Sequence, residues 1–232
     1  MKMPEYNKLP SELQCDEVRR YYDILKSKTA GLVLKRTFDI FVSLILIIIL
    51  LLPMAVIAVL IKCTSKGPVI YKQVRVTAFG KRFKIFKFRS MRTDADSKGE
   101  LLTVGEDSRI TKVGKFIRKF RLDELPQIFH VLSGKMTIVG TRPEVPKFTD
   151  RYTKEMLATL LLPAGVTSLA SIKFKDEAEL LEKADDVDKA YIEEILPQKM
   201  KYNLEYIENF SFSGDIKLIF KTVAEVFSSR GE

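Results

Sequence analysis

The residues best suited to chemistry are two adjacent carboxylates, Asp123 and Glu124, which follow a strongly basic stretch of the chain. The stretch from 109 to 121 contains no acidic residue, and its cations are Arg109, Lys112, Lys115, Arg118, Lys119 and Arg121. Nearby cations favour the ionised form of a carboxyl group and lower its pKa. An ionised, partly desolvated aspartate can attack phosphorus, as it does in enzymes that form an aspartyl phosphate. The pattern therefore predicts chemistry on a phosphate, with Asp123 as the candidate nucleophile.

A short helix is predicted to carry this acid pair at its N-terminal end. Pro126 is tolerated best in the first turn of a helix, and Gly134 is a suitable residue for the helix end. The helix dipole would then favour the ionised forms of Asp123 and Glu124. The alternative is an ordinary solvated helix start, whose acids only complement the dipole. The acid pair alone does not separate these two interpretations, so the surrounding sequence has to do so.

Two strands are predicted in the basic region before the acid pair, at 69–71 and 83–88. No acidic residue lies between 72 and 92, where the cations are Lys72, Arg75, Lys81, Arg82, Lys84, Lys87, Arg89 and Arg92. Because side chains alternate along a strand, Lys84 is expected on the face opposite Phe83 and Ile85. Such a cationic face is suited to a diphosphate, nucleic acid or lipid headgroups, or it is simply solvated.

Further elements are predicted around this region. Apolar residues recur at helical spacing between 108 and 120, which indicates a basic amphipathic helix that lies in a headgroup layer or packs on a core. After a predicted strand at 136–139, Arg142 occupies a tight turn, where its guanidinium could bind phosphate through two hydrogen bonds. Residues 163–165 predict a loop, and charged helical sequence follows over 176–210.

The composition favours an anionic partner and disfavours several kinds of site. The 232-residue chain has a net charge of +9, which fits nucleic acid, anionic lipid or a phosphorylated small molecule. Cys15 and Cys63 are far apart and indicate neither a disulfide framework nor a zinc site, so a reducing, cytosol-facing environment is the simpler inference. The single histidine, His130, lies between apolar residues and is expected to be packed in a helix. Histidine-based triads and metal sites are therefore disfavoured.

The segment from Phe38 to Ile61 is apolar apart from Asp39 and Ser43, and its uninterrupted apolar stretch after Ser43 is long enough to be a membrane helix. Cationic residues flank both of its ends, so the distribution of positive charge gives no preferred orientation. Pro53 lies near the middle and is expected to kink the helix, as a hairpin that returns to the same membrane face requires. The alternatives are a single spanning helix with a tolerated proline, and a buried helix of a soluble domain.

Five sequence blocks occur in the order and spacing found in bacterial sugar transferases. They are Asp39 ahead of the apolar segment, Gly67-Pro68-Val69 with Tyr71 and Gln73, Lys87-Phe88-Arg89-Ser90-Met91, Leu122-Asp123-Glu124-Leu125-Pro126-Gln127, and Val139-Gly140-Thr141-Arg142-Pro143. From about Lys35 to Thr222 the chain resembles the monotopic polyprenyl-phosphate phosphoglycosyl transferases. The resemblance implies an α/β fold, with a small catalytic core, a re-entrant N-terminal membrane helix and interfacial amphipathic helices. The expected divisions are an N-terminal appendage (1–34), the re-entrant helix (35–66) and the catalytic core with C-terminal interfacial helices (67–232).

The resemblance also implies a reaction with a covalent intermediate. Asp123 would attack the sugar-bearing phosphorus of a UDP-sugar and release UMP, and polyprenyl phosphate would then take the phosphosugar from the enzyme. Glu124 matches the second acid, which would position or deprotonate the lipid phosphate. Magnesium is the cofactor of the family, and Asp123 would be its ligand.

Several other residues match the family by position. Arg118 corresponds to an arginine that pairs with the nucleophile, and Arg142 to one that holds phosphate. Lys87 and Arg89 match a basic block near the active site, and Pro53 matches the break in the membrane helix. The implied location is the cytoplasmic face of the bacterial inner membrane, with the lipid bilayer and the two substrates as partners and no nucleic acid.

Three departures from the family pattern stand out. Leu52-Pro53 replaces a common Ser-Pro, Thr141 replaces a proline, and Pro163-Ala164-Gly165-Val166-Thr167-Ser168 differs from a loop that usually resembles Pro-Gly-Ile-Thr-Gly. The last change bears on recognition of the donor sugar. The alternative function is a membrane-anchored basic scaffold or lipid-binding protein without catalysis, which would not need Asp123. The sequence identifies neither the sugar nor the glycan nor the lipid length, and it does not distinguish a monomer from a homo-oligomer.

Overall fold

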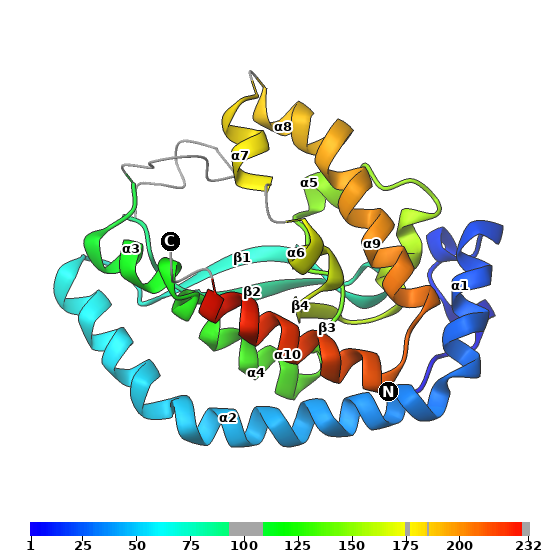
Figure 1. Ribbon diagram of the computed structural model, residues 1–232, viewed down its shortest axis with the longest axis horizontal. Helices are drawn as coiled ribbons and strands as arrows, with labels where there is room; N and C mark the ends of the chain where they lie inside the picture. The colour runs from blue at the N-terminus through cyan, green and yellow to red at the C-terminus, as the bar shows by residue number, and fades with distance from the viewer. Residues whose placement is uncertain (93–108, 175–176, 185, 229–232) are drawn as a thin grey trace.

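The computed structural model describes residues 1–92, 109–174, 177–184 and 186–228. It is a mixed α/β structure, mostly helical, with short strands in the middle of the molecule and helices around them (Figure 1). The α-helices are α1 (Asp16–Ser27), α2 (Thr29–Thr64), α3 (Lys112–Lys119), α4 (Ile128–Ser133), α5 (Pro146–Thr149), α6 (Leu169–Lys173), α7 (Glu177–Glu182), α8 (Val187–Ala190), α9 (Leu196–Glu208) and α10 (Phe212–Ser228). The predicted beginnings of two helices, at residues 108 and 176, lie outside the described residues.

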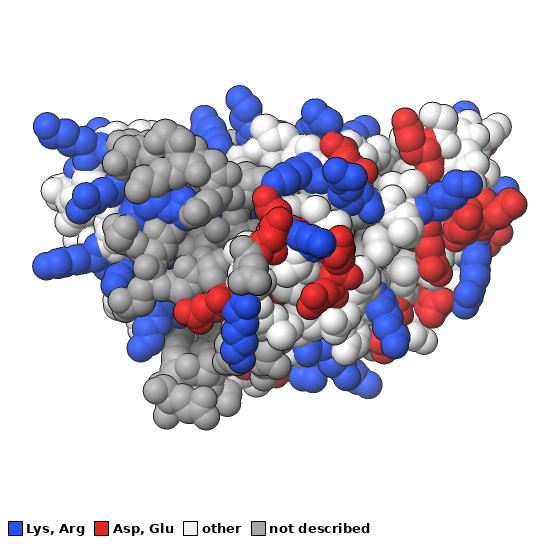
Figure 2. Space-filling model, turned by 90° about the horizontal axis from the view of Figure 1, so that it is seen from above, with Lys and Arg blue, Asp and Glu red and all other residues white. Residues whose placement is uncertain are grey.

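The predicted basic strands form a hairpin, in which β1 (Ile70–Val76) pairs antiparallel with β2 (Arg82–Phe88). Phe83 and Ile85 are buried while Lys84 is exposed, so the predicted alternation is confirmed. Lys87 lies on the same face of the strand as Ile85 and therefore points into the body of the protein. The basic residues of this region are thus divided between a solvent-exposed face and an inward one. Figure 2 shows that basic side chains also spread widely over one face of the molecule, while acidic ones gather mainly towards the α1 end and the centre.

A second, parallel pair of strands lies beside the hairpin, between β3 (Met136–Val139) and β4 (Ala164–Thr167). The strand at 136–139 was predicted, but the predicted loop at 163–165 is wrong, because Ala164 and Gly165 begin β4. The two backbones approach so closely that a Cβ at Gly165 would overlap the backbone nitrogen and oxygen of Gly140. Gly140 and Gly165 therefore permit the two strands to pack closely, and this strand pairing involves residues that are distant in the sequence.

Helix α2 carries the apolar segment and is long and apolar enough to cross a membrane. Only 17% of its most apolar window is buried, which argues against a buried helix of a soluble domain. The side chains of Ile48 and Leu52 are 77% and 74% exposed. The helix continues through Pro53 and bends towards α3 in its second half (Figure 1). A proline without a backbone donor is a sufficient cause for that bend.

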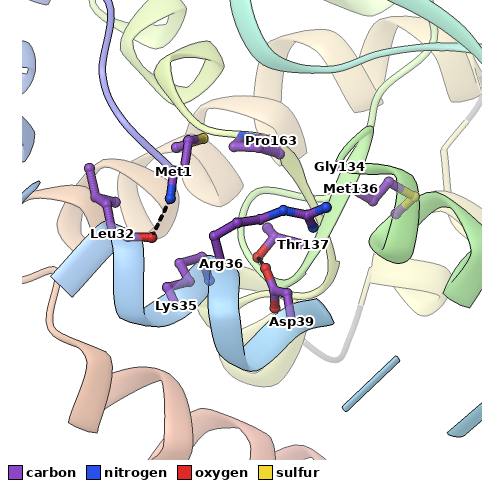
Figure 3. Close-up of a pocket in the computed structure, with 9 residues that line it drawn as sticks. All are labelled: Met1, Leu32, Lys35, Arg36, Asp39, Gly134, Met136, Thr137 and Pro163. Carbon is purple, nitrogen blue, oxygen red and sulfur yellow. Dashed lines mark hydrogen bonds between the residues drawn. The ribbon is translucent and has the colours of Figure 1, made fainter. Parts of the chain in front are cut away.

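The first turns of α2 are fastened to the strands and to α10 by buried polar side chains. Lys35 forms an ion pair with Asp215 at 2.7 Å and donates to the carbonyl oxygen of Val139 at 2.6 Å. The carboxylate of Asp39 accepts from the hydroxyl of Thr137 at 2.6 Å. Figure 3 shows Lys35, Arg36 and Asp39 around a cavity of about 130 Å³ at the junction of α2 with β3. Asp39 therefore fixes the start of the apolar helix against the central strands.

The segment before residue 29 shares a hydrophobic core with the rest of the chain. Leu13, Val18 and Leu25 are buried together with Val139 and Leu161. Helix α1 begins after a short 3-10 turn at Ser11–Leu13. The division of the chain at residue 34 stays a prediction, but the N-terminal segment packs as part of the folded body.

Candidate active site

The acid pair lies in a six-residue 3-10 helix, Leu122–Gln127, that runs directly into α4. Helix α4 ends at Gly134, which has a φ of +80°, so the predicted helix end is confirmed. Arg121, immediately before the acid pair, has a φ of +52°, a left-handed conformation that is costly for a residue with a Cβ. Such backbone strain persists only where the surroundings enforce it, and it is frequent at functional sites. Here the strained residue turns the chain out of α3 so that both acids enter the site.

Glu124 is held by two cations from distant parts of the chain. Arg142 donates to both carboxylate oxygens, with Nη2–Oε1 at 2.6 Å and Nη1–Oε2 at 3.2 Å. Lys87, on the inward face of β2, donates to Oε1 at 2.9 Å. Burial alone would raise the pKa of Glu124, but the charges and hydrogen bonds of Arg142 and Lys87 outweigh it and hold that pKa well below its usual range. Glu124 is therefore a fixed carboxylate anion.

Asp123 has the opposite environment, although it is the adjacent residue. Burial raises its pKa; the positive charge of Lys87 opposes that rise, Glu124 adds to it, and Arg118 opposes it again. The expectation that surrounding cations and a helix dipole lower the pKa of Asp123 is therefore wrong, because desolvation is the larger effect. Among the described residues, no cation lies within ion-pair distance of the Asp123 carboxylate. A backbone hydrogen bond at Asp123 itself also opposes the rise in its pKa. The carboxylate has no salt-bridge partner within the described residues and can therefore act on a ligand.

The predicted cationic residues are brought together only in part. Lys87 and Arg142 meet at Glu124, and Arg118 acts on Asp123 through its charge. Arg89 is buried and binds the end of α2 instead, donating from Nη2 to the carbonyl oxygen and hydroxyl of Ser65 at 2.8 and 2.7 Å. Its Nε and Nη1 are buried and have no hydrogen-bond partner within the described residues. Arg89 thus retains donor capacity but does not touch the acid pair.

Strand β4 supplies a contact that the sequence interpretation missed. Arg142 donates from Nη1 to the carbonyl oxygen of Val166 at 2.9 Å, and the amide of Gly165 donates to the carbonyl oxygen of Thr141 at 2.8 Å. The segment that was assigned to a loop therefore holds the turn that carries Arg142. The one sequence signal for this was Gly165, whose missing side chain permits the close approach of β3 and β4.

His130 is packed, as predicted. It is buried on α4 with its ring 4.4 Å from that of Phe86, and its Nε2 accepts a hydrogen bond from the Phe86 amide at 3.1 Å. Burial, with a smaller contribution from the charge of Lys135, lowers the pKa of His130 to about 4. The ring is therefore neutral near pH 7, and its role is structural.

The two carboxylates differ in their capacity to bind a metal ion. No group of three or more His, Cys, Asp or Glu side chains suited to a metal ion occurs in the described part of the chain. Magnesium is commonly held by one or two carboxylates together with substrate phosphates. Asp123 fits that mode because no cation pairs with it within the described residues, whereas Glu124 is already bound by Lys87 and Arg142. A cation at this site would therefore depend on Asp123 and on phosphate oxygens.

Comparison with known proteins gives consistent matches. A family model described as Bacterial sugar transferase matches residues 30–229. A Klebsiella pneumoniae protein named UDP-glucose:undecaprenyl-phosphate glucose-1-phosphate transferase is 38% identical over 204 residues, which are 86% of this chain and 41% of that protein. A Bacillus subtilis (strain 168) protein, named as a putative undecaprenyl-phosphate N-acetylgalactosaminyl 1-phosphate transferase, is 46% identical over 133 residues, 57% of this chain and 74% of that protein. The exopolysaccharide production protein PSS of Rhizobium leguminosarum bv. phaseoli is 37% identical over 207 residues, 83% of this chain and 94% of that protein. The chain thus spans less than half of the Klebsiella protein and nearly all of the Rhizobium one.

Proposed function

This chain belongs to the bacterial sugar transferase family, and we propose that it transfers a sugar phosphate from a UDP-sugar to polyprenyl phosphate. The products are a polyprenyl-diphosphate sugar and UMP, in the first membrane step of surface polysaccharide or glycan assembly. The names of the relatives support the substrate classes, and the acid pair supports the chemistry. The observation that carries the proposal is the contrast between Asp123, which has no ion-pair partner among the described residues, and Glu124, which two cations hold.

The reaction proceeds in two displacements at one phosphorus. An oxygen of Asp123 attacks the sugar-bearing phosphorus of the UDP-sugar, and the bond to the UMP oxygen breaks, so that UMP leaves with the bonding electron pair. An oxygen of polyprenyl phosphate then attacks the same phosphorus. The bond to Asp123 breaks, and the free carboxylate is regenerated. Splitting one transfer into two steps through a covalent intermediate is the general advantage of nucleophilic catalysis.

The neighbouring residues have separate roles in this scheme. Arg142 and Lys87 keep Glu124 ionised and fixed, so its carboxylate can align the lipid phosphate, whereas its low pKa makes it a weak proton acceptor. Arg118 and the unpartnered nitrogens of Arg89 supply positive charge for the phosphates. Asp123, together with phosphate oxygens of the substrate, would hold Mg²⁺, and the ion would supply charge neutralisation for the diphosphate.

We also place the protein at the cytoplasmic face of the bacterial inner membrane, with α2 as a re-entrant helix. Both ends of α2 pack on the same folded body: Lys35 on β3 and α10, and Ile57 and Ile61 beside Phe88 of β2. A helix that crossed the bilayer once would leave its two ends on opposite sides, whereas this body contacts both. The most exposed apolar side chains lie close to Pro53, where the helix would reach deepest.

Two amphipathic helices are suited to the membrane interface beside α2. Phe116 on α3 is 57% exposed, and Phe220 and Val223 on α10 are 70% and 48% exposed. Apolar side chains that project outward on amphipathic helices fit the boundary between headgroups and acyl chains, and the basic residues of α3 suit anionic headgroups. These helices would hold the acid pair close to the headgroup layer, where the phosphate of a polyprenyl chain resides.

The decisive test is the covalent intermediate. Purified protein would be incubated with Mg²⁺ and UDP-glucose, UDP-galactose or UDP-N-acetylgalactosamine without lipid, and its intact mass measured. We expect a phosphosugar adduct on the wild type and on the control Asp150→Asn, which changes an exposed aspartate, but none on Asp123→Asn. Absence of an adduct with every donor, together with no UMP release after polyprenyl phosphate is added, would favour the scaffold or lipid-binding alternative.

A further inference from the structure

A second buried polar cluster lies behind Arg142, and the proposed reaction does not use it. At its centre is Glu144, two residues after Arg142 and only 7% exposed. The hydroxyl of Tyr191 donates to Glu144 Oε1 at 2.6 Å, and Lys199 Nζ lies 3.5 Å from the same oxygen and 2.9 Å from the Tyr191 hydroxyl. Arg75 Nη1 lies 4.0 Å from Glu144 Oε2. Tyr191 therefore donates a short hydrogen bond to this carboxylate, whereas Lys199 and Arg75 lie farther from it. Lys199 also pairs with Glu177 at 3.2 Å.

The donors come from elements far away in the sequence. Tyr191 begins a π-helical turn, Tyr191–Ile195, between α8 and α9, and its ring packs 4.4 Å from that of Phe148. Lys199 follows on α9. π-helical turns are rare and are frequently associated with functional sites. This one places the Tyr191 hydroxyl and the Lys199 ammonium together on Glu144.

The turn that contains Arg142 and Glu144 has further supports. Arg75 donates to the carbonyl oxygen of Pro143 at 3.2 Å, and the Val76 amide donates to the carbonyl oxygen of Glu144 at 3.0 Å. The backbone of the turn is therefore fixed by β1 without help from Tyr191 or Lys199. Those two residues act on the charge of Glu144 rather than on the backbone.

Arg142 lies in the field of two buried carboxylates. Glu124 raises the pKa of Arg142 most, burial opposes that rise, and Glu144 adds to it. Within the described residues Arg142 nevertheless forms its ion pair with Glu124, and its hydrogen bonds to carboxylate oxygens go to Glu124. A buried carboxylate without donors is costly and attracts nearby cations. Arg75 already donates to Gln73 and to the carbonyl oxygen of Pro143, so Arg142, in the same turn as Glu144, is the other cation that Glu144 would attract. The selective pairing of Arg142 thus requires that Glu144 be satisfied by other groups.

We propose that Tyr191 and Lys199 are positioning residues, which satisfy the Glu144 carboxylate and so keep Arg142 on Glu124. The effect of this arrangement on turnover rests on the proposed function, but its effect on the position of Arg142 does not. When these donors are removed, Glu144 competes for the Arg142 guanidinium. Arg142 then leaves Glu124, and the active site loses one of the two cations that hold its fixed carboxylate.

The kinetic test combines removal of the donors with removal of the competing charge. Tyr191→Phe keeps the ring on Phe148 and removes the hydroxyl, and Lys199→Met removes the ammonium while keeping a long apolar chain. We expect UMP release by the double variant to fall by about 10- to 100-fold, mainly in kcat, the loss typical of a displaced active-site group. Adding Glu144→Gln should restore much of that activity, because a neutral amide does not compete for Arg142. Lys201→Met, an exposed lysine of α9, is the matched control and should behave as the wild type.

If Tyr191 and Lys199 only support the fold, the triple variant should be no more active than the double variant. If the triple variant is as inactive as the double variant, or worse, the proposal is wrong. A crystal structure of the double variant, or of Lys199→Met if the double variant does not fold, gives a readout that needs no turnover. Arg142 should then bind Glu144; an Arg142 that remains on Glu124 would overturn the proposal. Absence of UMP release by the wild type would count against the proposed function alone.

Discussion

Replacing Arg142 tests the central feature of the candidate site, the fixed carboxylate of Glu124. Arg142→Ala removes both hydrogen bonds to that carboxylate and the one to Val166 on β4. Arg142→Lys retains a positive charge but cannot form the two parallel bonds of a guanidinium. In both variants the pKa of Glu124 should rise, because Arg142 is one of the two cations that keep it low. We therefore expect a graded loss, larger for alanine than for lysine.

The size of the loss follows from the burial and the partners of Glu124. Removing one member of a buried ion pair typically costs about 3–5 kcal/mol of stability. Lys87 stays at 2.9 Å from Glu124, and the Glu124 side chain keeps 13% exposure, so we expect about 2–3 kcal/mol for Arg142→Ala. Turnover should fall by about 100- to 1000-fold, as when one electrostatic donor is removed from an active site. Arg142→Lys should lose about tenfold.

The assay is UMP release from a UDP-sugar in the presence of undecaprenyl phosphate, with thermal unfolding measured on the same detergent preparations. Arg151→Ala changes an exposed arginine nearby and is the control for loss of charge. The unfolding data separate a folded, inactive variant from an unfolded one. Wild-type kcat/KM in folded Arg142→Ala would refute the assignment of Arg142 and its pair with Glu124 to the active site.

Two further predictions concern stability. Gly165→Ala places a Cβ on the backbone of Gly140, so it should destabilise the protein by about 1–3 kcal/mol and lower UMP release by shifting the Arg142 turn. The control Gly31→Ala should be tolerated, because its Cβ would meet Phe210 at an ordinary 3.4 Å. Equal unfolding midpoints for the two variants would contradict the prediction for Gly165. The pKa of His130 is about 4 in the folded protein and 6.5 in the unfolded chain, so the unfolded chain binds more protons between these pH values. The free energy of unfolding should therefore rise by about 3 kcal/mol from pH 4 to pH 6.5 and then level off. In His130→Gln, which keeps an acceptor for the Phe86 amide but does not titrate, the unfolding midpoint should lack this part of the pH dependence; an unchanged pH dependence would show that other groups cause it.

Local patterns in the sequence predicted much of the fold. Alternation of buried and exposed residues gave the hairpin and the exposed position of Lys84, and the apolar segment gave α2. Gly134 marked the end of α4 because a left-handed residue is needed there. These features depend on neighbours in sequence, which is why sequence spacing reveals them. Five short sequence blocks likewise predicted the family to which the chain belongs.

Features that depend on distant neighbours were missed. Strand β4 pairs with β3 across 24 intervening residues, and its Pro-Ala-Gly start was assigned to a loop. The raised pKa of Asp123 was also missed, because a count of nearby cations contains no information on how deeply the carboxyl group is buried. The cluster on Glu144 joins β1, the Arg142 turn and α9, so no single stretch of sequence contains its pattern.

The two acids differ because they need different partners for different tasks. A nucleophile must keep an oxygen free of donors, since each hydrogen bond to a carboxylate stabilises its ionised resting form and lowers its reactivity. A carboxylate beside an incoming diphosphate would also repel it, unless its charge is balanced. The structure separates these demands: Lys87 and Arg142 balance Glu124 directly, while their field and that of Arg118 reach Asp123 without binding it. If Arg142 were drawn away from Glu124, only Lys87 would balance that carboxylate, and the added negative charge beside Asp123 would weaken the approach of the donor. The position of the Arg142 guanidinium therefore controls how strongly the acid pair opposes an incoming phosphate.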